Sequence, residues 1–383
     1  MSSIDIIITI SLIIFLSPFI SKFLRLPTSV IEIVLGALCG AWGMLEHVAL
    51  FELVAEFGFL YLMFLAGLEV DLKKIFKIDK AILKRGILYI FLLYFTSFLI
   101  SKNFGFSDVF IAIFPLISVG LIAALRKEYG KNLHWLNLSI AIGSLGEVIS
   151  IAVLTLLSAG LEFGYGGEFL KSILILSVFL LIISVIFKLL QVLFWWNPEL
   201  KTTLMPKIDN EEQDIRLSMA LLFIFIAIML YLHLEVAFGA FIAGIIIATF
   251  FEHKRSLPHK LSSFGFGFLV PIFFIYTGSS FKLSSLMIEG MIASALIITF
   301  LMIFVRIVAS FAFVKILTLK ERFLFALSHS MPLTLLVAIA TIAFHTKVID
   351  EFDYMAFILA SILEVIVVMV TIKSFVKLSG KRV

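Results

Sequence analysis

The stretch Leu136–Leu157, LNLSIAIGSLGEVISIAVLTLL, decides the fold class of this chain. A helix that spans a bilayer needs about 20 apolar residues, and this stretch supplies them. Its one charged residue, Glu147, lies near the middle, roughly 16 Å from the start at the helical rise. A charged side chain at that depth costs about 2.5–3.5 kcal/mol on insertion scales, and such residues are rare and usually functional. The stretch therefore predicts a membrane-spanning helix that carries chemistry.

The composition of the whole chain agrees with this interpretation. Of 383 residues, 62% are hydrophobic and 15% are charged, and the mean hydropathy is +1.17. Soluble domains average roughly 25% charged residues, so this chain needs lipid to cover its apolar surface. The lone cysteine, Cys39, excludes an intrachain disulfide. No cleavable signal pattern precedes the first apolar run, which we expect to be a true span.

Thirteen hydrophobic segments follow one another along the chain. They show no strand-like alternation, and lipid admits only helices or closed barrels, so we expect helices. The sequence thus predicts an all-α polytopic membrane protein with about 13 transmembrane helices. The segments are Ile4–Leu24, Pro27–Leu45, Leu50–Val70, Ile82–Ile100, Val109–Leu125, Leu136–Leu157, Phe169–Trp195, Leu217–Leu232, Val236–Phe250, Leu261–Phe281, Met291–Val314, Phe323–Phe344 and Tyr354–Ile372.

Lysine and arginine residues alternate in density between successive loops. One set of alternate loops and the C-terminal tail hold 24 of them, whereas the opposite loops hold four. Because cytoplasmic loops carry the excess of basic residues, we expect the N-terminus outside and the C-terminus in the cytoplasm. The pI of about 9.0 then reflects membrane topology, and no nucleic-acid partner is expected.

Three pairs of short matches relate the two halves of the chain, each joining segments seven apart. An odd separation turns the copies opposite ways across the membrane, as in alternating-access transporters built from inverted repeats. The last two pairs share an offset of 217 residues. The pairs are Ala66–Leu72 with Thr277–Leu283, Pro115–Ile117 with Pro332–Thr334, and Ser144–Ile149 with Ser361–Ile366.

The repeat suggests a division of the chain. Residues 1–160 form a first half of six helices, and residues 161–216 form a linker helix and a cytoplasmic loop. Residues 217–383 form a second half of six helices. No soluble regulatory domain is expected.

Two prolines predict interrupted helices. Pro115 and Pro332 each lie inside an apolar run, where a proline removes a backbone hydrogen bond. Ser118 and Thr334 follow these prolines closely. Their hydroxyls are candidate ligands for a cation, although such residues more often bond back to their own helix.

Three charged residues in spans are candidates for function. We expect Glu147 to hold either a proton or a small cation, with a structural salt bridge or hydrogen bond as the alternative. Ser144, one turn earlier on the same face, is a candidate to orient it. Arg306 is the candidate core cation, either neutralising a carboxylate or forming an architectural ion pair. Glu364, the repeat mate of Glu147, either pairs with Arg306 or lines a cavity, and the sequence leaves open which acid pairs with Arg306.

Other signals exclude classes of function. The chain has no glycine-rich phosphate loop, metal cluster or nucleophile triad, so no enzyme, no cofactor and no metal beyond a transported monovalent cation is expected. His329 is expected to be a packed core histidine, with pH sensing as the alternative.

Several motifs carry a resemblance that extends over nearly the whole chain. The chain resembles the bacterial monovalent cation/proton antiporters, the branch that contains sodium/proton exchangers and glutathione-gated potassium-efflux antiporters. The matching residues are Leu26-Pro27, Glu32, Gly36, Gly40, Phe64–Leu72, Phe238–Gly244, Pro271–Phe274 and Gly278.

The resemblance implies a homodimer in the bacterial inner membrane, with a moving core domain and a static dimerisation domain. It implies two crossing helices broken at Pro115 and Pro332, with Glu147 as transport acid and Arg306 as core cation. The implied partners are Na⁺ or K⁺, H⁺ and membrane lipids, and the implied physiological role is pH homeostasis.

The chain departs from the family pattern at two positions. Gly146-Glu147 stands where the family usually has two polar or acidic residues, and Ser118-Val119 where a threonine usually follows the serine. One carboxylate favours electroneutral exchange, and the missing nucleotide-binding domain favours sodium. The alternatives are a channel-like or gated potassium efflux path and a membrane sensor that has lost transport.

Overall fold

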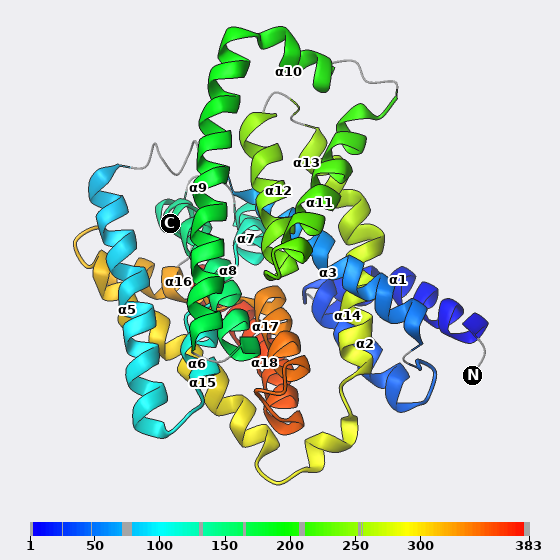
Figure 1. Ribbon diagram of the computed structural model, residues 1–383. Coiled ribbons are helices and arrows are strands. Elements are labelled where there is room, and N and C mark those ends of the chain that lie inside the picture. Colours follow the sequence, from blue (N-terminus) through cyan, green and yellow to red (C-terminus); the bar gives the residue numbers. More distant parts are fainter. Residues whose placement is uncertain are drawn as a thin grey trace. The chain divides into compact units, whose positions relative to one another are not determined.

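The structure is a computed structural model. It describes residues 3–24, 26–46, 48–70, 79–129, 133–163, 166–206, 211–251, 254 and 256–378, and all its regular elements are helices (Figure 1). Parts of the sequence predictions lie outside these residues. Among them are Asp71 and Leu72, which end the first repeat match, residues 164–165 and 207–210 of the predicted linker, and several basic residues of the predicted cytoplasmic loops.

Long apolar helices dominate the described residues. Nine helices or continuous helical runs are long and apolar enough to cross a membrane, and a bent pair would make a tenth. The prediction of an all-α multi-pass membrane protein is confirmed. The nine are α1 (Ser3–Leu24), α3 (Ala49–Glu69), α5 (Lys80–Phe104), α8 (His134–Phe163), α9 (Gly167–Trp196), α11 (Gln213–Tyr231), the run of α13 (Leu257–Phe264), η1 (Gly265–Leu269) and α14 (Val270–Ser279), α15 (Met291–Ala309), and α18 (Glu351–Leu378).

The other predicted spans are shorter or interrupted. Two of them are single helices, α2 (Thr28–Ala41) and α12 (Val236–Phe250), and both are too short to count as spans by length. Two more are broken pairs, α6 (Asp108–Ile113) with α7 (Gly120–Tyr129), and α16 (Leu319–His329) with α17 (Leu333–His345). Each of the thirteen predicted segments thus coincides with a helix or a pair. Helix length supports nine or ten spans, so the count of thirteen stays a prediction.

Contacts group the helices into two compact units. The first comprises Met1–Leu53, Lys74–Leu154 and Pro271–Val383, and the second comprises Val54–Lys73 and Thr155–Val270. The predicted division at residues 160 and 216 follows chain order, and grouping by contact does not test it.

In the first unit, α15 packs along α18 and α5, while α17 packs against α18. Glycines allow α2 to approach α14 closely: a side chain at Gly36 would collide with the backbone of Ile275, and one at Gly278 with the carbonyl of Ile33. This unit contains both broken pairs and also every candidate site residue.

In the second unit, two glycines bring α3 against α12. A Cβ at Gly67 would overlap the carbonyl oxygen of Phe241, and a Cβ at Gly244 would overlap that of Phe64. Ion pairs fasten the start of α11: the buried Asp214 carboxylate lies 3.6 Å from Lys254 Nζ and 3.4 Å from Lys260 Nζ. The backbones of α3 and α12 are thus in direct contact at Gly67 and Gly244, with no room for an added Cβ.

We predict that Gly67→Ala destabilises the protein, because the methyl group must push α3 away from the α12 backbone. Overpacking of this kind costs about 1–3 kcal/mol. The melting temperature of the purified protein in detergent measures the effect. Gly267→Ala is the matched control, since a Cβ there meets nothing within 4 Å. Equal melting temperatures for the two variants would disprove the close α3–α12 contact.

Candidate functional site

The chain leaves helical structure between α6 and α7, around Pro115. α6 ends at Ile113 and α7 begins at Gly120, and the intervening residues up to Val119 are buried. Because proline has no N–H and its ring disfavours a preceding turn, the interruption lies where the sequence predicts it. Peptide groups in this segment lack helical partners and must find others.

A second interruption lies between α16 and α17, around Pro332. α16 ends at His329, α17 begins at Leu333, and the two helices are bent by 43°. The two interruptions come together at their hydroxyl groups, since Ser118 Oγ lies 3.4 Å from Thr334 Oγ1. Two segments more than 200 residues apart in sequence thus meet inside one unit.

Glu147 lies on α8 with 1% of its surface exposed, and its carboxylate is directed at the first interruption. Oε1 accepts a hydrogen bond from Ser118 Oγ at 3.1 Å and one from the Val119 backbone N–H at 3.4 Å. A buried carboxylate is stable only when such donors replace water. The structure thus joins Glu147 and Ser118 directly, and Thr334 through Ser118.

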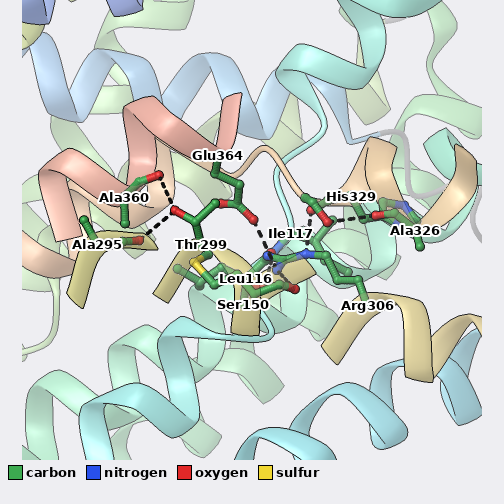
Figure 2. A network of polar contacts seen from close by, with 12 residues as sticks. Leu116, Ile117, Ser150, Ala295, Thr299, Arg306, Ala326, His329, Ala360 and Glu364 are labelled. Atoms are coloured by element: carbon green, nitrogen blue, oxygen red, sulfur yellow. Dashed lines mark hydrogen bonds and ion pairs between the residues drawn. The ribbon is translucent and has the colours of Figure 1, made fainter. Parts of the chain in front are cut away.

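Neighbours of Glu147 on α8 hold the same segment. Ser150 Oγ accepts a hydrogen bond of 3.2 Å from the Ile117 N–H, a contact drawn in Figure 2. Gly146 faces the Ile117 side chain, which a Cβ at this position would meet. Ser144 points elsewhere: its hydroxyl donates to Ile140 O of its own helix at 2.9 Å. Of the described contacts, none therefore supports the expected role of Ser144 in orienting Glu147.

Arg306 connects both interruptions through its guanidinium group, which is fully buried on α15 (Figure 2). Nε donates to the backbone oxygen of His329 at 2.8 Å, and Nη2 donates to that of Leu116. Nη1 donates to Met302 O of its own helix. A cationic donor makes stronger hydrogen bonds than a neutral one, which suits it to carbonyls that have lost their helical partners.

The acid that faces Arg306 is Glu364 on α18. Its Oε1 lies 3.6 Å from Arg306 Nη1, both side chains are almost fully buried, and Figure 2 shows the carboxylate directed at the guanidinium group. Among the described residues, neither Glu364 oxygen has a hydrogen-bond partner. The sequence left open whether Glu147 or Glu364 pairs with Arg306. In the structure, Glu364 forms this ion pair.

Sequence reasoning missed three residues near these groups, Ser150, Tyr89 and Ser139. Ser150 lies three residues after Glu147 on the same helix face, a spacing that could have revealed it. His329 was expected to be packed, and it is, but its partners Tyr89 and Ser139 come from two other helices. No spacing along the chain indicates those contacts.

The arrangement offers oxygen ligands to a small cation. The Glu147 carboxylate and the hydroxyls of Ser118 and Thr334 lie within one cluster, and hard cations prefer such oxygens. Within the described ranges, no group of three His, Cys, Asp or Glu side chains could hold a metal ion. The chemistry of this donor set suits a singly charged ion more than a divalent one.

Comparison with known proteins places this chain in a family. Residues 10–378 match the family described as sodium/hydrogen exchanger, transmembrane. A probable Na⁺/H⁺ antiporter of Methanocaldococcus jannaschii is 28% identical over 282 residues, covering 70% of this chain and 68% of that protein. An ammonium/H⁺ antiporter subunit, AmhT, of Alkalihalophilus pseudofirmus is 28% identical over 291 residues, covering 72% and 70%.

A solved structure shows the same fold. The sodium/proton antiporter MjNhaP1 of Methanocaldococcus jannaschii superposes with a TM-score of 0.70 at 16% identity, covering 97% of this chain and all of that one. The match of the family over almost the whole length carries the assignment. The chain belongs to the sodium/hydrogen exchanger family.

Proposed function

We propose that the protein exchanges a monovalent cation for protons by alternating access, and that Glu147 holds either the cation or the proton. Cation/proton exchange is the activity of the family. The observation that carries the residue assignment is the buried Glu147 carboxylate, bonded to Ser118 and Val119 at a helix interruption. The family makes exchange a better explanation than a channel or a sensor without transport.

Competition for one carboxylate supplies the coupling. A bound cation or a bound proton each neutralises Glu147, whereas the bare carboxylate carries a charge through an apolar path at high cost. Only the two neutral forms can then change their access from one side to the other. In this proposal, the hydroxyls of Ser118 and Thr334 complete the oxygen shell around the cation. Their position beside the Glu147 carboxylate supports their assignment as ligands.

The charges of the core favour exchange of one cation for one proton. Arg306 Nη1 and Glu364 Oε1 lie 3.6 Å apart and compensate each other. Glu147 is the carboxylate that we propose to balance the charge of the cargo. Gly146 contributes no second carboxylate beside it. The proposed stoichiometry moves no net charge across the membrane.

We propose Na⁺ as the cation, with K⁺ as the alternative that the measurement below separates. The support is that several relatives are named as Na⁺/H⁺ antiporters, the M. jannaschii protein among them. We also propose a homodimer in the bacterial inner membrane with a cytoplasmic C-terminus and a role in pH homeostasis. The asymmetry of basic loops supports the orientation.

We predict that Glu147→Gln reduces exchange to the background of empty vesicles, because the amide binds neither a proton nor a cation by charge. Dequenching of a pH-sensitive dye in everted vesicles measures proton movement after addition of Na⁺, Li⁺ or K⁺. Glu289→Gln, which changes an exposed carboxylate, is the control and should retain full exchange. Full activity of Glu147→Gln would remove the assignment of this residue.

We predict that the rate of exchange in proteoliposomes does not depend on membrane potential. A potassium diffusion potential set with valinomycin, of either sign, should leave the Na⁺-driven proton flux unchanged. A flux that increases when the interior is made negative would show that net charge moves, contrary to the proposed stoichiometry.

We predict that Arg306→Gln destabilises the protein by about 3–5 kcal/mol, the cost of breaking one half of a buried ion pair. The double variant Arg306→Gln/Glu364→Gln should recover part of this loss, because it removes the uncompensated Glu364 charge. Melting temperatures of the purified variants test the order. A double variant less stable than Arg306→Gln would contradict the Arg306–Glu364 pair.

A further inference from the structure

His329 is the last residue of α16, immediately before the second interruption, and its side chain is fully buried. Aromatic rings enclose its imidazole: the Phe325 centroid lies 4.4 Å away in an edge-on arrangement, and that of Tyr89 lies 5.5 Å away. The ring cannot turn in such a position without displacing its neighbours. Its two nitrogens therefore have fixed partners.

Both ring nitrogens make hydrogen bonds to other helices. Nε2 lies 2.9 Å from the backbone oxygen of Ser139 on α8, and Nδ1 lies 3.1 Å from the hydroxyl of Tyr89 on α5. A carbonyl oxygen can only accept, so Nε2 carries the hydrogen, and in the neutral ring Nδ1 accepts from Tyr89. The partners thus assign the tautomer.

A glycine lets the imidazole reach α8. A Cβ at Gly143 would lie 3.3 Å from His329 Nε2 and 3.3 Å from the Val119 side chain, closer than ordinary contacts. Gly143 lies one helical turn after Ser139 and one turn before Glu147, on the same face of α8. His329 therefore lies against the helix face that presents Glu147 to the first interruption.

The backbone of His329 is fixed as well, because its carbonyl oxygen accepts the 2.8 Å hydrogen bond from Arg306 Nε (Figure 2). One residue thus joins the end of α16 to α5, α8 and α15. Only a short non-helical turn separates it from Thr334, the hydroxyl that meets Ser118. His329 therefore anchors the end of α16 from which the chain leads to Thr334.

We infer that His329 is a positioning residue, whose imidazole sets the spacing between Glu147 and the hydroxyl of Thr334 and thereby the affinity for the transported cation. The inference rests on the proposed function of Glu147. The imidazole carries neither the cation nor the proton, since both nitrogens are engaged in holding helices. Its role is to pre-organise the oxygen ligands of Glu147, Ser118 and Thr334 before the cation binds.

The test measures Na⁺-dependent proton flux in proteoliposomes across a range of Na⁺ concentrations. His329→Ala should raise the KM for Na⁺ about tenfold, as expected for loss of a buried hydrogen bond, with a smaller change in maximal rate. His329→Gln should restore most of the affinity, because its amide offers a donor and an acceptor. His345→Ala is the control, since His345 is an exposed histidine at the end of α17 and should leave KM unchanged.

A second variant tests the inference with the histidine in place. Tyr89→Phe should raise KM, because it removes the hydroxyl that donates to His329 Nδ1, and it covers the case in which His329→Ala fails to fold. Melting temperatures of the variants separate loss of folded protein from loss of affinity.

The outcomes distinguish the two proposals. An unchanged KM in the folded variants, with only a lower melting temperature, would show a structural role and overturn the positioning role, while Glu147 remains the exchange group. Absence of any cation-driven proton flux in the unmodified protein would overturn the proposed function, and the positioning role with it.

Discussion

Peptide groups released from a helix inside a membrane protein must find partners where water is scarce, and this constraint organises the core of the molecule. The two interruptions release several such groups at once. Leu116 O and His329 O are bonded by Arg306, the Ile117 N–H by Ser150, and the Val119 N–H by Glu147. The first role of these polar residues is thus to form hydrogen bonds with the backbone groups that the interruptions release.

Because it bonds this backbone, Glu147 has a structural role in addition to its proposed role in transport. It accepts hydrogen bonds from the first interruption, and it is the group proposed to carry the cargo. In the proposed exchange, a cation at Oε1 would compete with the Ser118 hydroxyl and the Val119 N–H for the same oxygen. Occupancy and the geometry of the interruption are therefore linked through a single atom, which gives a transporter a direct means to connect binding with rearrangement.

The sequence predicted those parts of the fold and the candidate site that depend on isolated residues in apolar runs. Glu147 and Arg306 are conspicuous because charged residues are rare in membrane spans. Pro115 and Pro332 are conspicuous because a proline removes a backbone hydrogen bond from its helix. Contacts between distant segments were predictable only in part. Pairing of Glu364 with Arg306 was one of two alternatives from the sequence, and the approach of His329 to Ser139 depends on how helices pack. Hydropathy also does not reveal that α2 and α12 are too short to count as spans by length. The direction of the Ser144 hydroxyl depends on its rotamer, which helix periodicity leaves undetermined.

The contact between Gly146 and Ile117 has an evolutionary consequence. An acidic side chain at position 146 would meet the end of the Ile117 side chain, and that side chain belongs to the interruption itself. A second acid here requires the Ile117 side chain to change rotamer or to be replaced by a shorter residue. The effects of substitutions at positions 146 and 117 are therefore coupled by epistasis.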